Sequence, residues 1–189
     1  MKLPIEVSAR HIHLSKNDLE ALFGVDYELT KFRSLTQLSD FAAEEFLTVK
    51  AKESEIKNVR IVGPVRAETQ VELSLTDSFS LGIKLPVRIS GDIEGTPGVI
   101  LKNEKNGNEV FLEKGAIVSC RHIHCNFSDA EKLKIKNGDK ISVKVAGDRG
   151  LIFENVAVRA GENYTLGMHI DIDEGNSAGI NKKGFGEIV

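Results

Sequence analysis

The chain lacks the features that mark several common protein classes. Its 189 residues include only two cysteines, too few for a disulfide framework, which favours a bacterial-type cytoplasm. No run of about eighteen apolar residues occurs, so no membrane-spanning helix is expected. The formal net charge of -3 gives no reason to expect a nucleic-acid or membrane partner. Strand-like sequence begins within the first few residues, so we expect no signal peptide.

The fingerprints of common nucleotide-binding and hydrolase sites are also missing. The sequence contains neither a P-loop nor a dinucleotide-binding glycine pattern. It contains no nucleophile elbow of the Ser-His-Asp type. The length allows one good hydrophobic core or two small ones. The chemistry of the chain must therefore be sought among its scarce reactive residues.

Histidine is scarce, and its placement is the most informative feature of the sequence. The five histidines fall in three places, and two of these places are copies of each other. Residues 7–13 and 118–124 both contain Val, Ser, Arg, His, Ile and His in the same order. Residues two apart on a strand point to the same face, so each copy can aim two imidazoles at one point. The repeat therefore predicts two metal-binding sites.

Each histidine pair needs a third ligand, because a catalytic zinc keeps three protein ligands and one open position. His169 is the only remaining imidazole and can complete one site. The other site requires a carboxylate or a thiolate. Glu72 is a candidate, because it lies between the apolar residues Val71 and Leu73, where a carboxylate without a partner is unusual. The alternative is an edge-strand glutamate that faces water.

The two cysteines have different predicted roles. Cys120 has the same strand parity as His122 and His124, so it could join them as a ligand. The alternative is a small buried side chain, because Ala9 occupies the matching position of the first copy. Cys125 has the opposite parity and is predicted to be structural.

Arginines accompany both histidine pairs. Arg10 and Arg121 precede the pairs and should point to the opposite face of the strand, while Arg60 and Arg66 flank a turn at residues 63–64. The planar guanidinium matches phosphate geometry. A metal pair near arginines indicates a site for an anion, phosphate above all. The alternative for any single one of them is a surface position in solvent.

The rest of the pattern favours a mainly β fold. Strands are expected at 46–51, 59–62, 71–75 and 140–145, and short helices at 15–23, 128–133 and 173–178. Ser128 begins a predicted capping box, and Ser15 begins a weaker one. Many short strands with close turns favour two small, closely packed β-barrels with short capping α-helices. We expect residues 1–9 and 119–189 to form one barrel and residues 10–118 the other, with the metal site in the cleft between them.

Three separated motifs resemble the PduL-type phosphate acyltransferases, phosphotransacylases associated with propanediol and related bacterial microcompartments. The motifs are the doubled Ser-x-Arg-His-x-His, residues 63–72 and residues 168–176. The resemblance implies a two-barrel fold with two zinc ions. It also implies reversible transfer of a short acyl group, propanoyl or acetyl, between CoA and phosphate. These small-molecule substrates agree with the absence of features for nucleic-acid or membrane binding.

The resemblance also assigns roles to residues of this sequence. One zinc ion would be held by His11, His13 and Glu72, and the other by His122, His124 and His169. Arg66 would bind phosphate. The positions that resemble CoA contacts are Ser8, Arg33, Arg60, Phe79 and Asn176. Imidazole and carboxylate ligands also suit other divalent transition metals.

The resemblance further implies a homodimer or larger homo-oligomer in the bacterial cytoplasm or in a microcompartment. Microcompartment members often carry an N-terminal encapsulation helix, which this sequence does not show. Two other functions fit the same ligands. One is a dizinc hydrolase of a small phosphate or thioester substrate, and the other is a zinc-stabilised binding barrel without catalytic activity.

Overall fold

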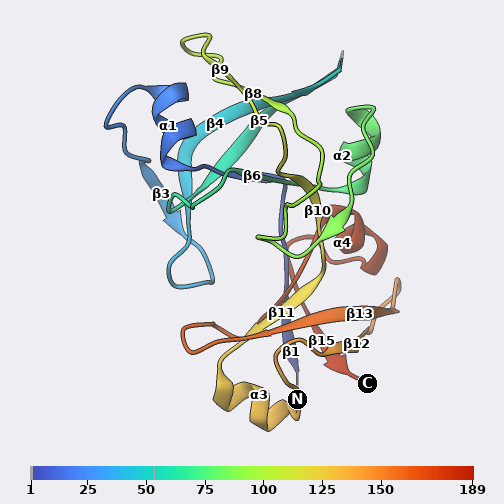
Figure 1. Cartoon of the computed structure of the whole chain (residues 1–189). Coiled ribbons are helices and arrows are strands. Elements are labelled where there is room, and N and C mark those ends of the chain that lie inside the picture. The colour runs from blue at the N-terminus through green and yellow to red at the C-terminus, as the bar shows by residue number, and fades with distance from the viewer. Residues whose placement is uncertain (1, 53) are drawn as a thin grey trace. The chain divides into compact units, whose positions relative to one another are not determined.

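The computed structural model describes residues 2–52 and 54–189, and the chain forms two units. The split unit combines Met1–Ala9 with Cys120–Val189, and the central unit comprises Arg10–Ser119. The N-terminal strand, at the dark-blue start of the colour range, and the yellow to red C-terminal part of the chain in Figure 1 thus belong to the same unit. No helix among the described residues is long and apolar enough to cross a membrane.

The split unit is a closed β-barrel. Among the described residues its six strands follow the order β1-β14-β11-β13-β12-β15 around the barrel. The strands are β1 (Leu3–Val7), β11 (His122–Cys125), β12 (Lys140–Val145), β13 (Leu151–Ala160), β14 (Gly167–Ile170) and β15 (Lys183–Ile188). Two helices, α3 (Phe127–Leu133) and α4 (Ile172–Ala178), follow β11 and β14. Cys125 is fully buried in the barrel core, as predicted for a structural cysteine.

The central unit is built on a nine-stranded sheet, counted over the described residues, that forms a half-barrel. Its strand order is β7-β10-β6-β2-β5-β4-β8-β9, with β3 paired to β4. The strands are β2 (His11–His13), β3 (Lys31–Ser34), β4 (Phe41–Ala51), β5 (Ser54–Gly63), β6 (Gln70–Leu73), β7 (Val87–Arg88), β8 (Ile100–Lys102), β9 (Glu109–Phe111) and β10 (Ala116–Ser119). The helices are α1 (Lys16–Phe23) and α2 (Leu75–Ser80).

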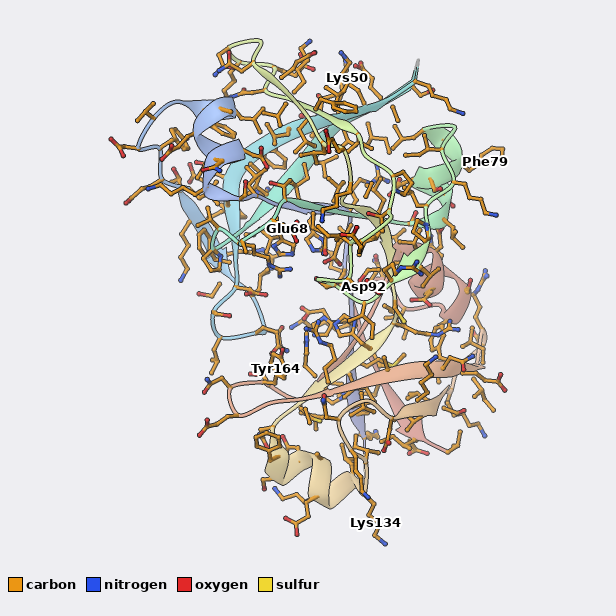
Figure 2. The ribbon with its side chains drawn as sticks, viewed as in Figure 1. Lys50, Glu68, Phe79, Asp92, Lys134 and Tyr164 are labelled. Carbon is orange, nitrogen blue, oxygen red and sulfur yellow. The ribbon has the colours of Figure 1, made fainter. Side chains whose placement is uncertain are left out.

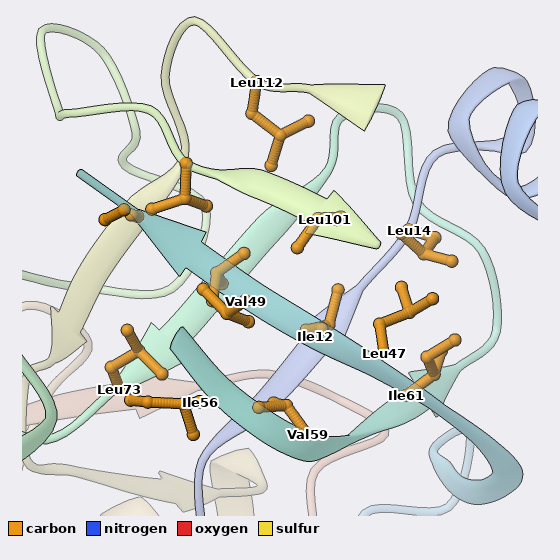
Figure 3. Close-up of a cluster of buried hydrophobic side chains, with 14 of the residues drawn as sticks. Ile12, Leu14, Leu47, Val49, Ile56, Val59, Ile61, Leu73, Leu101 and Leu112 are labelled. Carbon is orange, nitrogen blue, oxygen red and sulfur yellow. The ribbon is translucent and has the colours of Figure 1, made fainter. Parts of the chain in front are cut away.

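A core of aliphatic side chains holds the central sheet in place. Ile12, Leu47 and Ile61 come from three neighbouring strands and are almost completely buried (Figure 3). Each fully buried aliphatic side chain contributes about 1.5–3 kcal/mol to folding. Ile12 lies between His11 and His13, so its burial on the inner face directs both imidazoles to the opposite face of β2. The core therefore fixes the direction of the histidine pair.

The sequence repeat is only part of a larger structural repeat. In the central unit β2, α1, the β4–β5 hairpin, β6 and α2 occur in this order, with β3 as an additional strand before the hairpin. In the split unit β11, α3, the β12–β13 hairpin, β14 and α4 occur in the same order. Strand β2 pairs parallel with β5 and antiparallel with β6, as β11 does with β13 and β14. The two histidine pairs therefore occupy equivalent places in two copies of one topology.

Each histidine pair is preceded in the sequence by a strand that pairs with the structural repeat carrying the other histidine pair. Strand β1 precedes β2 in the sequence but pairs parallel with β14 of the split unit. Strand β10 precedes β11 but pairs parallel with β6 of the central unit. Strand β1, which leads into His11 and His13, therefore completes the barrel that carries His122 and His124. Strand β10, which leads into His122 and His124, completes the sheet that carries His11 and His13. For this reason the split unit combines both ends of the chain.

The predicted mainly β fold with short helices is confirmed, with differences at the element ends. Strand β6 ends at Leu73 because Ser74 caps α2, a helix that the sequence pattern did not predict. The predicted capping box at Ser128 is wrong. The N-cap of α3 is Asn126, whose side chain accepts a hydrogen bond from the Asp129 amide at 2.8 Å. An N-cap asparagine does this as well as a serine, so α3 begins at Phe127, one residue before Ser128.

Candidate functional site

The first candidate metal site lies on β2 and β6 of the central unit. His11 and Glu72 are directly opposite each other in this antiparallel pair. Glu72 Oε2 lies 3.7 Å from His11 Nε2, and Glu72 Oε1 lies 3.8 Å from His13 Nε2. The candidate ligand atoms of the three residues all lie within 4.8 Å of one another. The three side chains can therefore share one metal ion.

Glu72 is not an edge residue. Strand β6 lies between β10 and β2, and all four of its residues are buried. Glu72 itself is only 6% exposed. The alternative of an edge-strand glutamate that faces water is therefore wrong. A carboxylate this deeply buried requires hydrogen bonds and a cationic partner.

The protonation of this group suits a metal. His13 Nδ1 donates a hydrogen bond to the Val62 carbonyl at 3.0 Å, which leaves the Nε2 lone pair on the side of Glu72. Burial, with the charges of His11 and Arg66, lowers the pKa of His13 to about 3, so the imidazole is neutral. Burial alone would raise the pKa of Glu72, but its interaction with His11 and its hydrogen bonds with Ser90 and Ser119 hold it below its usual range. A neutral imidazole and an ionised carboxylate are the forms that bind metal.

The split unit carries a second group, made of imidazoles alone. His122 of β11 lies directly opposite His169 of β14. The ring centroids are 4.6 Å apart for His122 and His124, and each of them lies within 5.3 Å of the His169 ring. His122 Nδ1 donates to the Cys120 carbonyl at 2.8 Å, as His13 Nδ1 does to Val62. The structure thus brings together the three histidines that the sequence analysis assigned to one site.

The third candidate ligands occupy the same position of the structural repeat. Glu72 lies opposite His11 just as His169 lies opposite His122. In each copy the strand is followed at once by a helix whose N-cap, Ser74 or Asp171, forms a capping box. Sequence comparison alone missed this second repeat because a carboxylate replaces an imidazole.

Arg10 and Arg121 are committed to ion pairs within their own units. An Arg10 nitrogen lies 2.9 Å from Asp77, and Arg121 Nη1 lies 2.8 Å from Glu174. Both acids stand at the third position of the helix that follows the third-ligand strand, α2 or α4. Each arginine therefore ties the start of its histidine strand to that helix, and the ion pair occupies one nitrogen of its guanidinium. Asp77 and Glu174 were not predicted as partners, since only the tertiary fold reveals them.

Arg66 contacts the network around Glu72. Its Nη1 donates a hydrogen bond to Ser90 Oγ at 3.0 Å. Its backbone amide donates to the Leu14 carbonyl at 2.8 Å, which places the start of its side chain beside the end of β2. The charge of Arg66 also contributes to the lowered pKa of His13. The guanidinium thus lies close enough to the His11, His13 and Glu72 group to act with it.

The residues that resemble CoA contacts fall in both units. In the central unit Arg33 is exposed on β3, Phe79 is 88% exposed on α2 (Figure 2), and Arg60 is partly buried on β5. The Arg60 guanidinium lies 4.1 Å from the Phe46 ring centroid and 4.9 Å from that of Phe32.

In the split unit, the Ser8 amide donates to the Ile170 carbonyl at 2.8 Å, and Asn176 is exposed on α4. All five residues are exposed or partly exposed.

Cys120 lies outside the strands, in the two-residue connection between β10 and β11. It is partly buried, and burial raises the pKa of its thiol, with a further contribution from Glu174. Its Sγ contacts the Arg121 carbonyl at 3.5 Å. Cys120 does not belong to the first candidate metal group, which is made of His11, His13 and Glu72.

Comparison with known proteins identifies close relatives over almost the whole chain. Residues 4–181 match a family model described as phosphate propanoyltransferase. The chain is 47% identical to the phosphate propanoyltransferase of Listeria monocytogenes, covering 98% of this chain and 86% of the relative. It is 49% identical to the enzyme of that name from Thermotoga maritima, covering 94% and 84%. The identity to that of Clostridioides difficile is 42%, covering 99% and 88%.

Proposed function

The chain belongs to the phosphate propanoyltransferase family of acyltransferases, and from this premise we propose that it transfers a short acyl group reversibly between CoA and inorganic phosphate at a two-zinc site. The acyl group is propanoyl or acetyl. The observation that carries the proposal is the buried group of His11, His13 and Glu72 with Arg66 beside it. A metal ion with an arginine next to it suits an anionic substrate.

The donor sets fit zinc. Three protein ligands with an open position are typical of catalytic zinc, and the ligand atoms of His11, His13 and Glu72 converge in this way. The rings of His122, His124 and His169 lie close enough together to be proposed as a second set of three. His11, His13 and Glu72 would hold one ion, and His122, His124 and His169 the other. Zinc bound there would supply charge neutralisation for phosphate and stabilisation of a leaving thiolate. The backbone carbonyls that accept from His13 and His122 are the outer contacts that orient such ligands.

In the proposed reaction phosphate is the nucleophile. Arg66 binds phosphate through its guanidinium fork and orients one oxygen toward the thioester carbonyl. The carbon–oxygen bond forms, the carbon–sulfur bond breaks, and CoA leaves as a thiolate. Ser8, Arg33, Arg60, Phe79 and Asn176 contact CoA in this proposal. Holding both substrates together supplies much of the rate enhancement, so no side-chain nucleophile is required.

The test is thiol release coupled to metal analysis. The purified protein with propanoyl-CoA and phosphate should release CoA thiol and form propanoyl phosphate, and elemental analysis should give two transition-metal ions per chain. The matched control omits phosphate. Equal thiol release with water alone would identify a thioester hydrolase, and active protein free of transition metal would contradict the metal assignment.

Cys120→Ala should retain most of the transfer activity. Transfer is direct in the proposed mechanism, and Ala9 occupies the equivalent position of the repeat, so this place in the fold accepts a methyl group. Steady-state thiol release and metal content should both stay within about twofold of the wild-type values. Loss of activity at normal metal content would instead indicate an acyl-cysteine intermediate.

A further inference from the structure

We propose that Ser90 and Gln70 are positioning residues that join the Glu72 carboxylate to the Arg66 guanidinium in one hydrogen-bonded network. The inference rests on the proposed function, in which Glu72 holds a metal ion and Arg66 holds phosphate. The new element is that metal binding at Glu72 and phosphate binding at Arg66 are not independent of each other. A single serine hydroxyl contacts both, so its loss should disturb metal binding and phosphate binding together.

The hydrogen bonds of Ser90 use its full capacity. A serine hydroxyl has one proton to donate and two lone pairs to accept. Ser90 Oγ accepts from Arg66 Nη1 at 3.0 Å and from Gln70 Nε2 at 2.9 Å. The Glu72 carboxylate is the third hydrogen-bond partner of Ser90, and Ser119 is a further partner of that carboxylate. With both lone pairs occupied, the hydroxyl proton points to Glu72, so Ser90 connects a cation with an anion.

Gln70 fixes the other side of the carboxylate. Its Nε2 donates to Glu72 Oε1 at 2.6 Å as well as to Ser90. Its Oε1 accepts from the Gly91 amide at 2.7 Å, which sets the orientation of the side-chain amide. Flipping that amide would place two donors against each other at Gly91 and an oxygen against the Glu72 carboxylate. Gln70 is 2% exposed, so water cannot replace these bonds at little cost.

Comparison with the split unit indicates that the Gln70 amide occurs together with the Glu72 carboxylate. Gln70 lies opposite His13, and the equivalent residue opposite His124 is Gly167. The residue two positions later is Glu72 in the central unit and His169 in the split unit. A Cβ at Gly167 would lie 3.9 Å from His169 Nε2. Where the third ligand is an imidazole, the equivalent position is a glycine, which has no side-chain donor. Where it is a carboxylate, Gln70 supplies one.

Removal of the Ser90 hydroxyl has two expected consequences. Glu72 loses a hydrogen bond that orients it, and loss of such an outer contact lowers metal affinity by about 10–100-fold. Arg66 loses the acceptor that fixes its guanidinium, so the KM for phosphate should rise about tenfold. The KM for acyl-CoA should stay within about twofold of wild type. A general loss of stability would not separate the two substrates in this way.

The experiment compares full-length variants in their metal-loaded form. Ser90→Ala removes the hydroxyl, Ser90→Thr retains it, and Gln70→Met removes the amide at similar volume. The control is Ser39→Ala, which removes an exposed hydroxyl that donates to Asp40 at 3.0 Å in the same unit. Zinc affinity is measured by chelator competition, and KM is measured separately for phosphate and for propanoyl-CoA. Ser90→Ala and Gln70→Met should weaken zinc binding at one site, and Ser90→Thr should restore both zinc affinity and phosphate KM.

Two results would overturn the proposal. One is wild-type zinc affinity and phosphate KM in Ser90→Ala, and the other is an equal rise of KM for both substrates. The zinc measurement does not depend on turnover. If the wild-type protein released no thiol with phosphate, the proposed function would fail, while zinc affinity would still decide whether Ser90 and Gln70 position Glu72.

Discussion

Replacement of Glu72 by alanine is expected to remove one of two metal ions and nearly all acyl transfer. Glu72 is the only carboxylate of the candidate group on β2 and β6, and alanine offers no ligand atom in its place. Two neutral imidazoles alone form a weaker site than two imidazoles with a carboxylate. Elemental analysis of the purified variant should give one ion per chain, and thiol release should fall at least about 100-fold.

Glu68→Ala is the matched control. Glu68 precedes β6 in the same segment, but its side chain is 57% exposed and lies 3.0 Å from Lys114 Nζ (Figure 2). Exposed ion pairs of this kind contribute little to stability, so its metal content and activity should match the wild type. Loss of metal in both variants would mean that the segment, and not the Glu72 carboxylate, is what the protein requires.

The second ion should survive the loss of Glu72 because its ligands come from another unit. His122, His124 and His169 stand on β11 and β14, which belong to a barrel with its own core. Their register and the hydrogen bond from His122 to Cys120 are set within that barrel. Loss of both ions in Glu72→Ala would show a single cooperative cluster and would contradict two separate sites.

The sequence was most informative where the chemistry follows from strand parity. His11 and His13 share a face because the intervening Ile12 is a core residue, and the same holds for the second pair around Ile123. The unusual apolar neighbours of Glu72 correctly indicated a buried carboxylate. These inferences succeeded because alternation along one strand depends only on local geometry.

The remaining features depend on contacts that local patterns do not encode. Ser90 stands in a turn 18 residues after Glu72, and only the fold brings its hydroxyl to Arg66 and Gln70 beside the carboxylate. Gln70 could have been found, because it has the same strand parity as Glu72. The sequence did not predict that β1 pairs with β14 and β10 with β6, because strand pairing depends on residues far apart in the chain.

Replacement of Arg66 by alanine should impair the use of phosphate far more than the use of acyl-CoA. The Arg66 guanidinium joins the Glu72 network by a hydrogen bond from its Nη1 to Ser90 Oγ at 3.0 Å. Hydrogen bonds to charged groups contribute about 1.5–3 kcal/mol each, so loss of the fork should raise the phosphate KM, or lower kcat, by about 10–100-fold. The fold should persist, because the contact to Leu14 comes from the Arg66 backbone amide.

Two further variants make the Arg66 result specific. Arg66→Lys keeps the positive charge but loses the planar fork, so it should recover only part of the phosphate affinity. Arg88→Ala removes an arginine of the same unit whose side chain is 41% exposed and lies 3.6 Å from Asp92, and it should leave both KM values unchanged. Zinc content is measured in all three variants, because the Arg66 side chain also contacts Ser90. Wild-type phosphate kinetics in Arg66→Ala would place the phosphate elsewhere, and full recovery in Arg66→Lys would show that charge alone, without the bidentate geometry, binds the anion.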